Sequence, residues 1–178
     1  MEKTSMREIA HRAGYTAGAI YSYFTNKEAL YGALLSESLD RLNACVQQAL
    51  TTNPSGPDRA RATATAFFDF YRENPRDLDL GFYLFQGMQP RGLTPTLNSE
   101  LNASLRNALQ PTQDALQALG MSAQQALEET TALFAHTVGL LVLSHTGRIR
   151  MFRQTSEGLF EKYLEQLINR TQMATQES

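Results

Sequence analysis

The stretch TSMREIAHRAGYTAGAIYSYFTNKEALYGALL, from Thr4 to Leu35, decides the fold of this chain. It predicts a first short helix over Ser5–Arg12 that ends at Gly14, because glycine adopts left-handed backbone angles at little cost. Thr16 is placed to cap a second short helix that runs to Phe24. Thr25 or Asn26 then caps a longer third helix. Two short helices joined by a tight, glycine-containing turn are typical of a helix-turn-helix unit.

Composition sets limits on the class of protein. The 178 residues carry 16 basic and 18 acidic side chains, so the net charge of −2 gives no general argument for nucleic acid. Residues 1–35 hold four basic and three acidic side chains, so any charge that faces DNA is local and modest. Cys45 is the only cysteine, which excludes an internal disulfide and fits a reducing compartment. No secretory signal follows Met1, and the longest apolar run, Gly139–Leu143, is too short to span a bilayer, so we expect a cytoplasmic protein without a membrane partner.

The rest of the chain has helical periodicity, and the predicted fold class is all-α. Leucines recur at steps of three and four residues over 26–50, which indicates one long amphipathic helix. Further helices are expected over 58–73, 75–87, 94–119, 123–147 and 155–171. Pro111 is expected to kink or interrupt the third of these. Ser122 with Gln125 forms a capping box before the fourth.

Three consecutive motifs carry a family resemblance: T-S-M-R-E-I-A-x-x-A-G, then G-A-I-Y-S-Y-F, then N-K-E-A-L. Together they resemble the TetR family of transcriptional repressors. The resemblance implies a helix-turn-helix DNA-binding domain over 1–35 and a helical effector-binding and dimerisation domain over 36–178. It also implies a homodimer that binds a palindromic double-stranded DNA operator and is released from it by a small-molecule effector.

One departure from the family pattern concerns the beginning of the chain. Family members carry an extra helix before this motif, and here the motif begins at Thr4, so we expect the DNA-binding domain to be incomplete at its N-terminus. Ile9, Ile20 and Phe24 are expected core residues that would lose a packing partner without that helix. A ligand-binding helical dimer without DNA affinity is therefore the alternative to a DNA-binding regulator.

The resemblance places the recognition region at Tyr15–Tyr23, which contains no Arg, Asn or Gln for bidentate base contacts. Small polar contacts, water and DNA shape are then expected to supply specificity. Thr16 would contact a base edge or a thymine methyl, Ser5 a phosphate, and Lys27 the DNA backbone. Ser5 and Thr16 have an alternative role as simple helix caps. The alternative for Tyr21 and Tyr23 is that they pack against the first helix. The candidate DNA-binding residues are Ser5, Tyr15, Thr16, Ala17, Gly18, Tyr21, Tyr23 and Lys27.

The middle helices are rich in aromatic residues, which favours an apolar pocket for a hydrophobic or aromatic effector. The alternative is an ordinary helical core. The candidate ligand-binding residues are Phe67, Tyr71, Phe82, Phe85, Met88, Phe134 and His136. By the same resemblance the last two helices form the dimer interface, with Leu140, Leu141, Leu159, Phe160, Tyr163 and Leu167 as candidates, some of which must face their own subunit.

Catalytic motifs are missing from the sequence. There is no glycine-rich phosphate loop, nucleophile elbow or zinc-binding spacing of cysteine and histidine. His136 and His145 are nine residues apart on one helix, which puts them on roughly opposite faces. Cys45 is expected to be an inert small residue, with redox sensing as the alternative. We therefore expect neither an enzyme nor a bound cofactor or metal.

Overall fold

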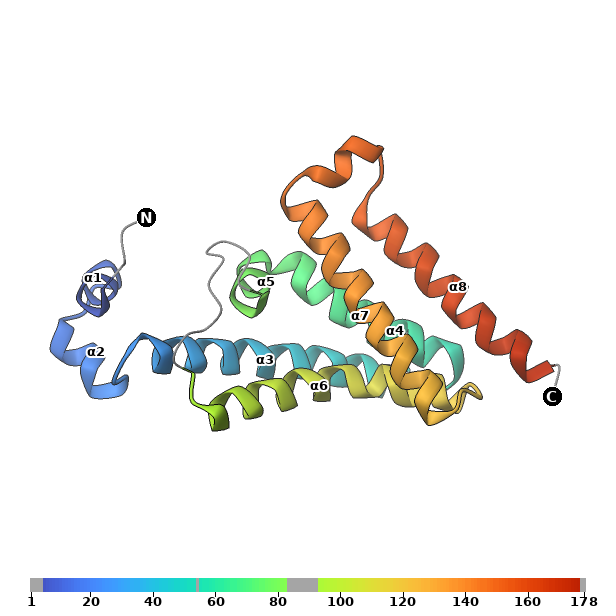
Figure 1. The fold of residues 1–178 in the computed structure, drawn as a ribbon, viewed down its shortest axis with the longest axis horizontal. Coiled ribbons are helices and arrows are strands. Elements are labelled where there is room, and N and C mark those ends of the chain that lie inside the picture. Colours follow the sequence, from blue (N-terminus) through green and yellow to red (C-terminus); the bar gives the residue numbers. More distant parts are fainter. Residues whose placement is uncertain (1–4, 54, 83–92, 177–178) are drawn as a thin grey trace.

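The computed structural model describes residues 5–53, 55–82 and 93–176, and every regular element in these ranges is helical (Figure 1). The helices are α1 Met6–Arg12, α2 Ala17–Tyr23, α3 Lys27–Thr52, α4 Gly56–Glu73, α5 Pro75–Phe82, α6 Pro95–Ala118, α7 Ala123–His145, the 3-10 helix η1 Arg148–Phe152, and α8 Ser156–Gln176. The all-α prediction is confirmed.

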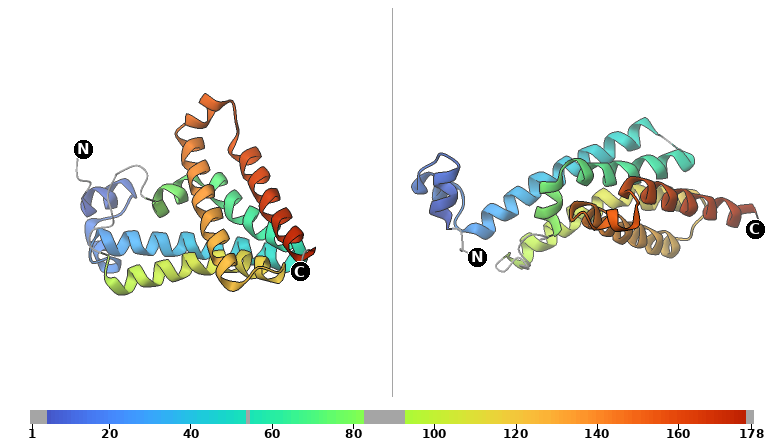
Figure 2. Two further views of the ribbon diagram at one scale, coloured as in Figure 1. Left: turned by 45° about the vertical axis from the view of Figure 1, so that its right-hand side comes forward. Right: turned by 90° about the horizontal axis from the view of Figure 1, so that it is seen from above.

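The long helices α3 and α6 lie side by side, and α4 packs against both of them (Figures 1 and 2). Helices α7 and α8 form an antiparallel hairpin that packs on α4 and α6. The short helices α1 and α2 lie at the free end of α3, where they contact each other. The core contains the fully buried side chains of Leu42, Phe68, Tyr71, Leu116 and Leu167.

Side-chain caps fix where the helices begin, as the sequence predicted. Ser5, Thr16 and Asn26 accept hydrogen bonds from the main-chain N–H groups of Glu8, Ala19 and Ala29 at 3.2, 3.2 and 2.7 Å. The capping box at Ser122 and Gln125 is present in both directions. Each cap stabilises its helix by about 1 kcal/mol.

Two helices differ from the prediction. Pro111 was expected to kink or interrupt its helix; it lies inside α6, which continues to Ala118, so the expected interruption was wrong. The missing N–H costs one hydrogen bond, but Pro111 is buried and its packing against neighbouring helices opposes that cost. Helix α8 runs to Gln176, beyond the expected end at Thr171. The predicted extension of α5 past Phe82 lies outside the described residues.

Helix α7 is long and apolar enough, by length and composition, to cross a membrane, and only 33% of its most apolar window is buried. A helix at the centre of a helical core would be buried on most of its surface. Part of the apolar surface of α7 therefore has no cover within this chain's described residues.

Candidate DNA interface and effector cavity

The helix-turn-helix unit is built around Gly14, whose φ of 78° places it in the left-handed region. The main-chain N–H of Tyr15 donates a hydrogen bond to the Ala10 carbonyl across this turn, at 2.9 Å. Met6 and Ala10 are the buried side chains of α1. The turn thus holds α1 and α2 in a fixed relation.

The apolar centre of this unit differs from the sequence-based expectation. Ile9, Ile20 and Phe24 are only half-buried, and α2 has no buried residue, so the expectation that these three form a core was wrong for the described chain. Two seven-residue helices cannot enclose three large side chains between them. Apolar surface is therefore exposed on the inner side of α1 and α2.

The predicted recognition residues lie at one tip of the molecule, away from the α3–α8 bundle (Figure 1). Tyr15, Tyr21 and Tyr23 are 65, 50 and 83% exposed. Ser5, Thr16, Gly18 and Lys27 are also exposed, and Ala17 is half-buried. The arrangement leaves the whole outer face of α2 free to enter a groove.

Capping leaves two hydroxyl groups available for DNA. The oxygens of Ser5 and Thr16 accept from main-chain N–H groups, and each hydroxyl hydrogen remains free to donate. A helix cap and a DNA contact are therefore compatible roles for these residues. The local charge is modest because Arg12 is paired with Glu8, at 2.5 Å, while Arg7 and Lys27 are exposed.

Four of the predicted ligand-binding residues form one aromatic cluster, made of Phe67, Tyr71, Phe82 and Phe134. Ring centroids are 5.3 Å apart for Phe67 and Tyr71 and 5.5 Å for Tyr71 and Phe82. Phe134 lies 5.9 Å from both Phe67 and Phe82. The space between Phe67 and Phe134 is only about 10 Å³, so the cluster is tightly packed there, while Phe134 also borders an open pocket of about 290 Å³ between α6 and α7.

The other side of the cluster opens on a cavity of about 220 Å³ between α3, α4, α5 and α6. Burial, and to a lesser extent the Asp77 carboxylate, raise the pKa of the Tyr71 hydroxyl above its ordinary value, so it stays protonated. Asn98 and Asn102 add polar groups to a mostly apolar wall. The lining residues are Leu35, Leu39, Tyr71, Gly81, Phe82, Leu93, Asn98, Leu101, Asn102 and Leu105.

The remaining predicted ligand residues are not part of this cavity as described. His136 stacks on Tyr163 of α8, with ring centroids 4.3 Å apart. It is two residues from Phe134 on α7, so the two side chains point to opposite sides of that helix. Phe85 and Met88 lie outside the described residues.

The cavity contains residues that a search for aromatic side chains missed. Asn98, Leu101, Asn102 and Leu105 occupy positions i, i+3, i+4 and i+7 of α6, which is the spacing of one helix face. That spacing was visible in the sequence, but only the packing of α3 against α6 shows that this face borders a cavity. A Cβ on Gly32 would lie 2.5 Å from Leu97, so α3 and α6 approach closely at this point.

Two polar contacts tie the cavity to the helix that carries the DNA-binding unit. The Tyr31 hydroxyl on α3 donates to the Leu80 carbonyl of α5, and the Arg41 guanidinium pairs with Asp77, both at 2.5 Å. Arg41 also lies over the Phe70 ring, 5.7 Å from its centroid. A displacement of helix α5 would therefore strain or break these contacts with α3.

Comparison with known proteins agrees with this geometry. The family model "Bacterial regulatory proteins, tetR family" matches residues 1–34, and the model "Tetracyclin repressor-like, C-terminal domain" matches residues 60–167. The second match covers more than half of the chain. The chain belongs to the TetR family of transcriptional regulators, which are DNA-binding proteins and not enzymes.

Individual relatives extend the comparison. The chain is 40% identical over 77 residues to the HTH-type transcriptional activator FasR of Mycolicibacterium smegmatis, a match that spans 43% of this chain and 35% of that protein. The crystal structure of a regulatory protein, SCO4313, superposes with a TM-score of 0.73 at 19% identity, over 93% of this chain and 85% of that one. The crystal structure of a TetR-family regulator from Rhodococcus RHA1 superposes with a TM-score of 0.66 at 21% identity, over 93% of this chain and 85% of that one. These two structures share the fold.

Proposed function

We propose that this protein is an effector-responsive repressor that binds a palindromic DNA operator as a cytoplasmic homodimer. The observation that carries the proposal is the exposure of α2 at the tip of the molecule, with the hydroxyls of Thr16, Tyr21 and Tyr23 on its surface. Base contacts come from Thr16, Ala17 and Gly18, and phosphate contacts from Ser5, Tyr15, Tyr21, Tyr23 and Lys27.

The dimer uses the outer surfaces of α7 and α8. Of the interface residues considered from sequence, Leu140, Leu141, Phe160 and Leu167 are buried inside the subunit, while Leu159 and Tyr163 are half-exposed. The apolar surface that needs cover therefore comes from these two and from the exposed small residues of α7, Ala132, Ala135 and Gly139. An isologous pairing presents two α2 helices to half-sites about 34 Å apart, or a multiple of that.

The effector occupies the cavity beside Tyr71 and Phe82. Its volume of about 220 Å³ suits a small, mostly hydrophobic or aromatic molecule that uses one or two polar groups on Tyr71, Asn98 or Asn102. Binding of such a molecule displaces α5 and α6. Because Tyr31 and Arg41 of α3 are bonded to α5, the displacement of α5 also moves α3. The spacing of the two α2 helices then changes, and the operator is released.

The experiment has two stages. First, sequences are selected from a pool of random DNA by this chain and by a version extended upstream, and the recovered sites are tested by gel shift. We expect two inverted half-sites. Second, a thermal-shift screen of small aromatic and hydrophobic compounds identifies binders, which are added to the gel shift and to a promoter reporter.

The outcomes separate the candidate functions. A compound that raises the unfolding temperature and dissociates the DNA complex supports the proposal, and reporter activation on adding it identifies a repressor. Recovery of no DNA sequence by either version would favour the ligand-binding dimer without DNA affinity. Binding by strongly hydrophilic anions alone would remove the hydrophobic effector.

A further inference from the structure

The turn between α7 and α8, residues 147–154, is an exposed structure with a fixed shape, called here the hairpin tip. Gly147 and Arg153 have φ values of 70 and 52°, and Arg153 is the only non-glycine residue with a positive φ in the described chain. For a residue other than glycine such a backbone is strained, and it persists only where neighbouring structure holds it. Here the buried side chain of Ile149 anchors η1 against α7.

The hairpin tip combines positive charge with exposed apolar side chains. Met151 and Phe152 are 75 and 65% exposed. Arg148, Arg150 and Arg153 are exposed too, and none of them has an ion-pair partner within the part of the chain that the structure describes. Arg, Met and Phe are enriched at protein interfaces, so the tip has the composition of a contact surface.

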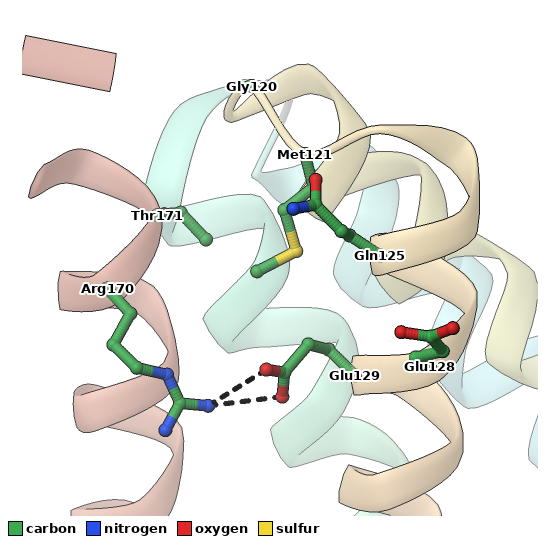
Figure 3. A pocket seen from close by; sticks show the side chains of 7 residues that line it. All are labelled: Gly120, Met121, Gln125, Glu128, Glu129, Arg170 and Thr171. Carbon is green, nitrogen blue, oxygen red and sulfur yellow. Dashed lines mark hydrogen bonds and ion pairs between the residues drawn. The ribbon is translucent and has the colours of Figure 1, made fainter. Parts of the chain in front are cut away.

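A pocket of about 270 Å³ lies at the opposite end of the same hairpin, between the start of α7 and the end of α8 (Figure 3). Arg170 reaches from α8 to Glu129 on α7, at 3.1 Å. Glu128 accepts a hydrogen bond from Gln124, at 2.6 Å, and has no basic partner among the described residues. Met121 adds an apolar wall. Glu129 is therefore neutralised by Arg170, and Glu128 leaves the pocket with one uncompensated negative charge.

The symmetry of the proposed dimer relates these two features. Helix α7 is 23 residues long, so the tip and the pocket of one chain are about 35 Å apart and cannot meet within it. Two α2 helices that reach one DNA must lie on the same side of the dimer, so its two-fold axis runs along the long axis of the molecule. Helices α7 and α8 cross that long axis obliquely (Figures 1 and 2), and the rotation therefore reverses their direction across it.

Charge favours this reversed pairing. If the hairpins paired in the same direction, the arginines of the two tips would meet and repel one another. In the reversed pairing each tip lies on the same side of the dimer as the partner subunit's pocket. A basic, apolar tip then faces an acidic pocket with an apolar wall, and the same contact forms twice.

We propose that the hairpin tip of each subunit docks on the Met121–Glu128–Glu129 pocket of a second copy of this chain. Arg148 and Arg150 approach Glu128, and Met151 and Phe152 pack against Met121. This contact rests on the homodimer proposed above and adds to the cover over α7 and α8. It makes the dimer's stability dependent on salt, because the contact includes exposed charges.

Charge reversal tests the contact without a ligand. Arg148→Glu with Arg150→Glu reverses the tip, and Glu128→Lys reverses the pocket. Each variant alone places like charges together twice per dimer, and we expect its dimer dissociation constant to rise about tenfold. Mixed together, the two variants form a heterodimer in which both contacts join opposite charges. With different tags, we expect about nine-tenths of the dimers at equilibrium to be heterodimers, against about one half for random pairing.

Matched variants control for general charge effects. Arg61→Glu reverses an exposed arginine on α4, and Asp114→Lys reverses an exposed acid that, like Glu128, accepts from a glutamine four residues earlier, at 2.7 Å. This control pair should mix randomly. A heterodimer share of one half for the tip and pocket variants, with wild-type protein dimeric, overturns the docking and leaves the dimer standing. Monomeric wild-type protein in sedimentation overturns both proposals.

Discussion

The hydroxyl of Tyr31 donates a hydrogen bond to the main-chain carbonyl of Leu80, 2.5 Å away, and so joins α3 to α5. Tyr31 lies one turn into the helix that begins beside α2, and Leu80 lies next to Gly81 and Phe82 of the cavity wall. This polar contact therefore connects the proposed effector site with the element that carries the DNA-binding unit, in addition to the ion pair of Arg41 and Asp77.

Tyr31→Phe is expected to lower the free energy of unfolding by about 1 kcal/mol, because it leaves a half-buried carbonyl without its donor. For a chain of this size that is a fall of about 2–4 °C in the unfolding midpoint, measured by calorimetry. Tyr23→Phe is the matched control, since that hydroxyl is on an exposed side chain. It should weaken DNA binding and leave the midpoint unchanged. Equal midpoints for the wild type and Tyr31→Phe would show that the hydrogen bond contributes nothing to stability.

Gly81→Leu is expected to fill the cavity without unfolding the protein. A Cβ at this position would lie 3.7 Å from the Tyr71 hydroxyl, an ordinary contact, and leucine has a higher helix propensity than glycine in α5. The midpoint of the free protein should hold or rise, while compounds that stabilise the wild type should lose their thermal shift. Ala44→Leu, at an exposed position of α3 outside the cavity and the proposed dimer surface, is a control for the compounds' response. Compounds that still stabilise Gly81→Leu must bind elsewhere.

Local chemistry made much of the fold predictable from sequence. Ser5, Thr16 and Ser122 each cap a helix where expected, because a hydroxyl at that position satisfies a main-chain N–H that has no partner within the helix. Pro111 shows the limit of such reasoning. Its local effect is to end helices, and the burial of one face of α6, from Leu101 to Leu116, outweighs that effect.

The cavity was only partly predictable. Phe67, Tyr71, Phe82 and Phe134 do come together, since aromatic side chains at helical spacing pack in cores. The side of the cluster that borders the cavity is set by the distance between helices α3 and α6. That distance cannot be predicted from the sequence. His136 was expected to join the same aromatic set as Phe134, but residues two apart on a helix point to opposite sides, and His136 stacks on Tyr163 instead.

Asp79→Asn is expected to stabilise the protein at neutral pH. Burial raises the pKa of the Asp79 carboxyl, and the interaction with His145, 3.6 Å away, lowers it to a smaller extent. Because the folded-state pKa lies above the unfolded one, the folded state holds its proton more tightly, and stability is lost as the pH rises through this window. The gain from asparagine should therefore appear above the carboxyl's ordinary pKa and vanish in acid. Urea denaturation from pH 3 to 8 measures it, and a gain of equal size at every pH would show that burial of the charged carboxylate is not the cause.

Thr16→Ala is expected to change which operator sequences are preferred, because it removes a hydroxyl and a methyl that face the bases in the proposed DNA complex. Affinity for the best wild-type site should fall about fivefold, equal to about 1 kcal/mol, with a smaller fall for other sites. Ser5→Ala is the matched control, since it also removes a helix cap, and it should weaken all sites alike. The preferences are measured by selecting binding sites from random DNA with each variant and comparing them with the wild-type sites. An unchanged preference for Thr16→Ala would count against the placement of the recognition helix on α2.

Lys27→Ala is expected to weaken binding to every DNA sequence and to reduce its dependence on salt. Lys27 is the exposed first residue of α3, next to α2, where its ammonium group can approach a phosphate without reading a base. Without this ammonium group about one counterion fewer is released from the DNA, so the slope of log K against log salt should fall by about 1 for each subunit. Lys162→Ala, at an exposed lysine of α8 far along the chain, is the control and should leave the slope unchanged. If both variants keep the wild-type slope, Lys27 does not contact the DNA backbone, and other groups of the helix-turn-helix unit, among them the exposed Arg7, must supply the phosphate contacts.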